Sequence, residues 1–186
     1  MSKLNLPLLD ARTAPEAARP TLANLEKKYG FLPNLYRVFA NAPIALDSYL
    51  ALSDAFVRSS FSPTERNIVL LAISRENGCE YCVAVHSTVA DMQKDPPHTT
   101  EAIRNDVAID DRKLEALRRF TQAVVRGRGN VDASQVQAFL DAGYQAPQIL
   151  EVLVGVTMKT LSNYTNHLAT PPLDQPFAGR VWKPKA

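Results

Sequence analysis

The sequence has 186 residues, of which 46% are hydrophobic and 22% are charged, and its formal net charge is +2. That length fits one ordinary domain, and the near-neutral charge with scattered basic residues argues against nucleic acid or an anionic membrane as a partner. No apolar stretch approaches the length needed to span a bilayer, and residues 1–7 lack the apolar core of a secretory signal. We therefore expect a cytoplasmic protein.

Helical periodicity runs through most of the chain, and no segment alternates apolar and polar residues as a strand would. Proline, glycine and capping residues mark the ends of the apolar runs. The helices expected in chain order cover residues 21–30, 33–40, 43–58, 62–77, 79–93, 99–105, 111–127, 132–142 and 147–166. We predict an all-α, single-domain helical bundle of homo-oligomeric assembly, because its apolar helices offer more surface than one small bundle covers.

The two ends of the sequence differ in composition from the helical part. Residues 1–20 are rich in Ala, Pro and Arg and predict an N-terminal arm with a turn of helix, and residues 21–168 form the predicted helical domain. Residues 169–186 contain four prolines. They predict an extended C-terminal tail that packs on a neighbouring copy of the chain.

The only two cysteines form a C-x-x-C pair. Cys79 follows the helix-breaking Asn77-Gly78 pair, Cys82 comes three residues later, and His86 follows one helical turn after that. A disulfide across so short a loop adds little stability, so the spacing favours a functional pair over a structural one. On a helix the three residues share one face, where the helix N-terminus would favour a Cys79 thiolate and His86 would serve Cys82 as a base. This set suits thiol oxidation and thiol–disulfide exchange.

Other interpretations of the cysteine pair fit less well. A structural zinc site needs four ligands, yet there is no second cysteine pair, and His98 and His167 are isolated. A thioredoxin-type motif would follow a strand, and none is predicted. Two buried cysteines on an apolar helix face remain an alternative, because free cysteine is among the most buried residue types. We expect no metal and no organic cofactor at this site.

The segment ERNIVLLAISRENGCEYCVAVH, from Glu65 to His86, closely resembles the core motif of alkylhydroperoxidase D-like proteins. These belong to the carboxymuconolactone decarboxylase superfamily. The resemblance implies an all-helical fold that assembles into trimers or hexamers, with the cysteine pair near a subunit interface. It also implies that Cys82 attacks the hydroperoxide, that Cys79 resolves the product as a disulfide, and that His86 relays protons.

One position departs from this resemblance. The relay glutamate of the family would lie twelve residues before the first cysteine, where this sequence has Asn67. Glu65 and Glu76 are the catalytic candidates that could replace it. Glu65 also fits a capping box with Ser62, and Glu76 also fits a solvated helix end, so both interpretations of each residue stay open.

Two functions from different classes fit the sequence. The first is a thiol-dependent (alkyl hydro)peroxidase or disulfide-exchange antioxidant enzyme, with a small hydroperoxide as substrate and a dithiol or thioredoxin-like protein as reductant. The second is a non-enzymatic redox-responsive oligomer in which the cysteine pair is a sensor. The Cys–His spacing favours the first function, and Asn67 favours the second. The cysteine pair argues against a lactone decarboxylase, which does not need it.

Overall fold

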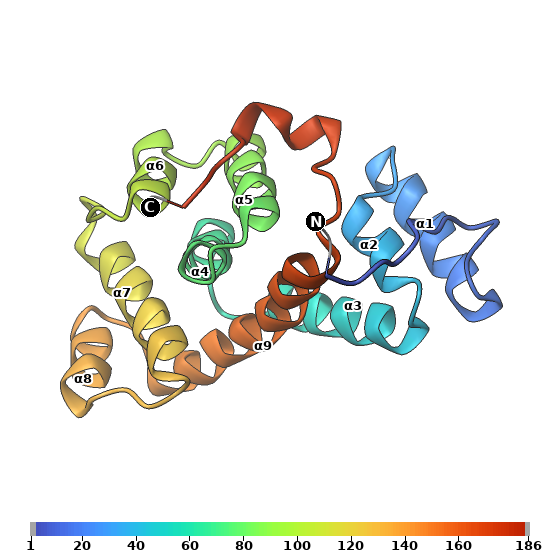
Figure 1. Ribbon diagram of the computed structural model, residues 1–186. Coiled ribbons are helices and arrows are strands. Elements are labelled where there is room, and N and C mark those ends of the chain that lie inside the picture. The colour runs from blue at the N-terminus through green and yellow to red at the C-terminus, as the bar shows by residue number, and fades with distance from the viewer. Residues whose placement is uncertain (1–2, 185–186) are drawn as a thin grey trace.

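Residues 3–184 of the chain, described by a computed structural model, form nine α-helices and two 3-10 helices, and no strand occurs among them (Figure 1). The prediction of an all-α, single-domain fold is confirmed. The helices are α1 Arg19–Tyr29, α2 Asn34–Phe39, α3 Pro43–Val57, α4 Pro63–Glu76, α5 Glu80–Gln93, α6 Pro97–Asn105, α7 Arg112–Gly127, α8 Ala133–Asp141 and α9 Ala146–Ala169, with 3-10 helices η1 Glu16–Ala18 and η2 Gln175–Arg180. None of these helices is long and apolar enough to cross a bilayer.

Helix α4 is the central element, and it contacts α5, α6, α7 and α9 (Figure 1). It begins with the predicted capping box, in which the Ser62 amide donates to Glu65 Oε2 at 2.8 Å and the Glu65 amide donates to Ser62 Oγ at 3.2 Å. It ends at Asn77, and Gly78 then turns the chain with a φ of 65°. This left-handed conformation suits glycine, and it separates α4 from α5 within three residues.

Two apolar clusters fill the interior. One is built from α4, α7 and α8 with parts of α3 and α9, and it includes Ile68, Leu117 and Phe139. The other lies where α1, α2 and α3 meet α5 and α9, and it contains both cysteines together with residues such as Met158. The cysteine pair is therefore part of a packed core, to which α1, α2, α3, α5 and α9 all contribute side chains.

The C-terminal tail differs from its prediction. Residues 170–184 cross over α5 and α6 of their own chain, and they include the 3-10 helix η2 where the sequence predicts an extended segment (Figure 1). Packing of the tail on a neighbouring copy stays a prediction. Arg104 donates to the carbonyls of Arg180 and Val181 at 3.1 and 3.0 Å, and Trp182 Nε1 donates to the Arg104 carbonyl at 2.9 Å. These hydrogen bonds fix the end of the tail against α6. The ends of the predicted arm and tail, residues 1–2 and 185–186, lie outside the described residues.

Close packing between α9, α3 and α4 depends on one glycine. A Cβ atom on Gly155 would lie 3.0 Å from Val69 Cγ1 and 3.1 and 3.2 Å from two ring atoms of Phe56. Both side chains belong to the packed interior, so they have little room to move. Gly155 therefore sets how closely α9 approaches the rest of the core.

We expect Gly155→Ala to lower the free energy of unfolding by about 1–3 kcal/mol, the usual scale for overpacking a core, despite the better helix propensity of alanine. Urea unfolding followed by circular dichroism measures this change. Gly127→Ala is the matched control, because no atom lies within 4 Å of its added Cβ. Equal stability of the two variants would contradict this account of α9 packing.

Candidate active site

The turn between α4 and α5 positions the two thiols. The Cys79 amide donates to the Ser74 carbonyl at 2.9 Å, so Cys79 is held as the N-cap of α5 with φ −84° and ψ 94°. Cys82 lies in the first turn of the helix that follows. Both residues are free thiols and both are buried, with exposed fractions of 1% and 2%.

Three polar residues on one face of α9, called the polar strip below, lie beside these thiols. Lys159, Asn163 and Asn166 follow at i, i+4 and i+7, which places them on one helix face, and all three are buried. Asn166 Nδ2 lies 3.6 Å from Cys79 Sγ and 3.2 Å from Cys82 Sγ, so one amide contacts both sulfurs. Asn163 Oδ1 accepts a hydrogen bond from Asn77 Nδ2 at 2.9 Å, which ties α9 to the end of α4.

Lys159 lies between the Cys82 sulfur and His86. Its side chain is only 1% exposed, its Nζ lies 3.1 Å from His86 Nε2, and it also donates to the sulfur of Cys82. Burial alone would lower the pKa of Lys159, but the neighbouring Cys82, Tyr49 and Cys79 raise it, so the ammonium form is favoured. The buried Lys159 ammonium therefore lies beside Cys82, which can carry the compensating negative charge as a thiolate.

The pKa values of the two thiols shift in opposite directions. Cys82 has the lower pKa, whereas the sequence predicts the lower pKa for Cys79. Burial by itself raises the pKa of Cys82, but the hydrogen bond from the Cys79 thiol and the charge of Lys159 outweigh it and lower the pKa to about 5. The same hydrogen bond, followed by burial, raises the pKa of Cys79. The prediction that the helix N-terminus makes Cys79 the thiolate is wrong: the Cys79 side chain makes no capping hydrogen bond, and its S–H donates a hydrogen bond to the Cys82 sulfur. The thiolate of the pair is Cys82.

His86 is held as a neutral imidazole. Burial and the charge of Lys159 both lower its pKa well below the usual range. Nδ1 lies 3.3 Å from Asn67 Oδ1, while Asn67 Nδ2 donates to the His86 carbonyl at 3.1 Å. We assign the proton to Nδ1, since the Asn67 oxygen accepts there and Nε2 then accepts from Lys159. His86 thus contacts Cys82 through Lys159 and orients the ammonium group.

The structure brings Cys79, Cys82 and His86 together but holds the two glutamate candidates elsewhere. Glu65 completes the capping box of α4 and accepts from the Tyr144 hydroxyl at 3.0 Å. Glu76 accepts from Arg126 at 2.7 and 2.9 Å, across to α7. The hydrogen-bonding group nearest His86 from α4 is instead the amide of Asn67.

Tyr81, between the two cysteines, ties the site to the C-terminal tail. Its hydroxyl donates to Asp174 Oδ2 and accepts from the Leu35 amide at 3.3 Å, and the Asn34 amide donates to Asp174 Oδ1 at 3.1 Å. Burial, followed by Asp174, raises the pKa of the Tyr81 hydroxyl, so the group remains a donor. The start of α2, the start of α5 and the tail therefore meet at one buried carboxylate.

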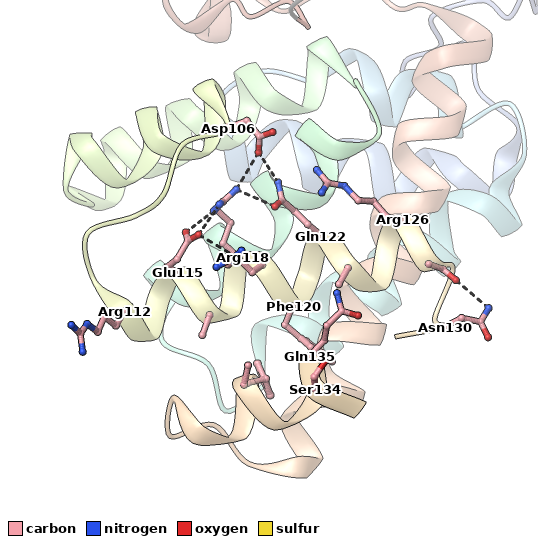
Figure 2. A pocket seen from close by; sticks show the side chains of 16 residues that line it. Asp106, Arg112, Glu115, Arg118, Phe120, Gln122, Arg126, Asn130, Ser134 and Gln135 are labelled. Carbon is pink, nitrogen blue, oxygen red and sulfur yellow. Dashed lines mark hydrogen bonds and ion pairs between the residues drawn. The ribbon is translucent and has the colours of Figure 1, made fainter. Parts of the chain in front are cut away.

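One cavity lies away from the thiols. It has a volume of about 930 Å³ and runs between α7 and α8 (Figure 2). Arg118 in its wall is already paired with Glu115 at 2.7 Å, Asp106 at 3.2 Å and Gln122 at 3.0 Å, as the dashed lines in Figure 2 show. A smaller cavity of about 220 Å³ lies beside the thiol turn, under the tail, and is lined by Glu80, Tyr81, Pro171, Leu173, Val181 and Trp182.

Comparison with known proteins gives a family and a fold. Residues 43–123 match the carboxymuconolactone decarboxylase family. The alkylhydroperoxidase AhpD core of an uncharacterized peroxidase-related protein from Ralstonia eutropha JMP134 superposes with a TM-score of 0.84, at 22% identity, over 98% of each chain. The family match covers residues 43–123, and the chain as a whole has an AhpD-like fold.

Two further solved structures share the AhpD-like fold. A peroxidase-related protein from Silicibacter sp. TM1040 has a TM-score of 0.81 at 18% identity, over 96% of this chain and 95% of that one. A cysteine-to-alanine variant of the debrominase Bmp8, in complex with 2,3,4-tribromopyrrole, has a TM-score of 0.77 at 18% identity, over 97% and 96%. No curated protein sequence matches the chain.

Half of the site lies outside the segment that matches the superfamily. Asn67, Cys79, Cys82 and His86 fall within residues 43–123, whereas the polar strip of α9 comes later in the chain. Sequence reasoning missed that strip. Its signal was the set of polar residues at i, i+4 and i+7 within an otherwise apolar helix, a spacing that solvent-facing residues would also show.

We expect the thiolate absorbance of Cys82 to titrate near pH 5 in the folded protein, and Lys159→Met to raise that pKa, because the substitution removes the ammonium that stabilises the anion. Since the folded pKa lies below the ordinary thiol value, the thiolate contributes to stability above that ordinary value, and the contribution is lost as the pH falls through about 5. Ultraviolet titration of the reduced protein measures both pKa values.

Lys113→Met is the matched control, since Lys113 pairs with Glu65 at 3.7 Å on the far side of α4. It removes the same charge and should leave the Cys82 titration unchanged. An unshifted pKa in Lys159→Met would show that Lys159 does not set the charge of Cys82.

Proposed function

We propose that this protein is a thiol-dependent peroxidase that reduces organic hydroperoxides, with Cys82 as the attacking residue and Cys79 as the resolving one. The observation that supports this most is the buried Lys159 ammonium beside Cys82, together with the low Cys82 pKa and the high Cys79 pKa. A thiolate is the nucleophile in thiol oxidation, and its partner must be a thiol that stays protonated until it is needed.

The first half-reaction oxidises Cys82. Its thiolate attacks the terminal oxygen of ROOH, the S–O bond forms, the O–O bond breaks, and the electron pair leaves on RO⁻. Lys159 supplies the proton that turns RO⁻ into ROH. Cys82 becomes a sulfenic acid, and Lys159 becomes a neutral amine stabilised by its contact with His86. The charge of the buried site is balanced before and after the step.

The second half-reaction forms the disulfide. The Cys79 sulfur attacks the sulfur of the Cys82 sulfenic acid, the S–O bond breaks, and the Cys79 proton leaves with the hydroxide as water. A dithiol or thioredoxin-like reductant then returns two electrons and two protons to the pair. The two free thiols suit a reducing compartment such as the cytoplasm, where we place the protein.

A redox sensor is the second candidate, and the burial of both sulfurs favours it, because exposed fractions of 1% and 2% limit access by substrate and reductant. In such a protein Cys79–Cys82 oxidation would change packing without sustained turnover. Multiple turnovers of an organic hydroperoxide per chain, with a dithiol as reductant, distinguish the enzyme from the sensor.

Cys82→Ser should abolish hydroperoxide consumption, because it removes the nucleophile. Cys79→Ser should form a sulfenic acid on Cys82 once, without recycling through a disulfide, because the resolving thiol is absent. Treatment of each variant with cumene hydroperoxide and a sulfenic-acid probe, followed by peptide mass mapping, locates the label. Label on Cys79 in the Cys82→Ser protein would reverse the two roles.

The same assay includes the reaction named for a structural neighbour. Wild-type protein is incubated with 2,3,4-tribromopyrrole and a dithiol, and bromide release is measured beside hydroperoxide consumption. Bromide release without hydroperoxide turnover would replace the peroxidase proposal with a debrominase one. Neither activity, together with a stable disulfide after oxidation, would favour the sensor.

We also propose that the chain forms a homo-oligomer through the outer face of α9. Leu150, Leu153, Tyr164 and Leu168 share one side of that helix and have exposed fractions of 65%, 38%, 55% and 47%. A contiguous apolar stripe of this kind is typical of a contact surface. Sedimentation should give a mass that is a multiple of the 20.5 kDa chain, and Leu150→Glu should reduce it. A wild-type monomer would exclude the trimer or hexamer that the sequence predicts.

A further inference from the structure

Two polar atoms of α9 beside the thiols have no hydrogen-bond partner of ordinary geometry among the described residues. They are Oδ1 of Asn166, whose residue is 6% exposed, and Nδ2 of Asn163, whose residue is fully buried. Buried polar groups in folded proteins are nearly always paired, since an unpaired group loses its hydration without a replacement. The acceptor Asn166 Oδ1 and the donor Asn163 Nδ2 lie on one face of α9. Together they point to a ligand that has both a hydrogen-bond donor and a hydrogen-bond acceptor.

Both amide groups lie beside the reacting sulfur. Asn166 Oδ1 is bonded to the same carbon as the nitrogen that lies 3.2 Å from Cys82 Sγ. Asn163 Oδ1 is occupied by Asn77, so the side-chain contact of Asn163 that lowers the Cys82 pKa comes from Nδ2. That nitrogen carries two hydrogens, so one remains for a ligand. The backbone of α9 fixes the two amides one turn apart, so neither needs to reorganise when a substrate arrives.

We propose that Asn166 and Asn163 bind the O–O–H group of a hydroperoxide. Asn166 Oδ1 accepts the hydrogen bond from the terminal O–H, and Asn163 Nδ2 donates to the oxygen that carries the organic group. A hydroperoxide offers one donor and one acceptor on adjacent atoms, and this pair of amides is complementary to it. The inference rests on the proposed peroxidase function and names the chemical class that the same site selects.

The amides then have separate roles in the reaction. When the Cys82 thiolate attacks the terminal oxygen, its proton stays on that oxygen in the sulfenic acid and remains bonded to Asn166. The leaving oxygen gains the electron pair of the broken O–O bond, and Asn163 stabilises this developing anion until Lys159 protonates it. An electrophile without an O–H leaves the Asn166 oxygen unpaired, so simple alkylation of Cys82 does not use these contacts.

The experiment compares two reactions of the same thiolate in Asn163→Asp, which keeps the oxygen that Asn77 contacts and removes the free donor. The rate constant with cumene hydroperoxide should fall about 100-fold, the scale for losing one donor to a developing oxyanion. The rate of Cys82 alkylation by iodoacetamide, measured above the thiol pKa of each protein, should stay nearly unchanged. Mass mapping confirms that Cys82 carries the label.

A second pair of variants tests Asn166. Asn166→Leu removes the acceptor and should lower the hydroperoxide rate more than the alkylation rate, whereas Asn166→Asp keeps an acceptor oxygen and should retain more of the hydroperoxide rate. Asn130→Asp, in the loop before α8, is the matched charge control and should change neither rate. Far-ultraviolet circular dichroism establishes that each variant is helical, and Asn163→Ser replaces Asn163→Asp if the latter is not.

The outcomes separate the two proposals. A wild-type protein that alkylates but consumes no hydroperoxide overturns the peroxidase function and this inference with it. If the wild type turns over and the Asn163 and Asn166 variants match it, only the inference is overturned. If both rates fall together in each variant, the amides act through the thiolate alone, which also overturns the inference. A selective loss of the hydroperoxide rate supports it.

Discussion

A lysine ammonium held inside the protein against a cysteine sulfur is the interaction on which the rest of this site depends. Removing one ion from water costs on the order of several kcal/mol, even after relaxation, so neither Lys159 nor a Cys82 thiolate is stable there alone. Together they form a neutral pair. Lys159 lies one turn after Gly155, where α9 approaches α3 and α4 closely.

The charge of that pair also explains the neutral residues around it. His86 sits against the ammonium and is uncharged, because a second cation there would be repelled. Asn67 occupies the position where the resemblance implies a glutamate, and its amide contacts the His86 ring and carbonyl without adding charge. A carboxylate at that point would give the buried site an excess negative charge beside the thiolate. The substitution is therefore consistent with proton transfer through Lys159 in place of a glutamate relay.

Most of the fold could be predicted from local sequence, whereas only half of the site could. Prolines, glycines and the Ser62–Glu65 box mark helix ends because they act on their own neighbours, so the helix bounds agree closely with the pattern. The site joins α5 to α9, a contact made by packing across the chain. Local sequence patterns cannot predict that Lys159 contacts Cys82, or that the Cys79 thiol donates a hydrogen bond to Cys82. The tail was missed for the same reason, since its contacts with Arg104 are long-range.

The order of these elements along the chain has a consequence for synthesis on the ribosome. Cys79 and Cys82 emerge well before α9, which carries Lys159, and the tail comes later still. Until α9 docks, the two thiols lack their cation and their amides and behave as ordinary, largely protonated cysteines. The nascent chain is therefore protected from premature oxidation by its own incompleteness. On the proposed function, Cys82 becomes reactive only when α9 has docked against α5.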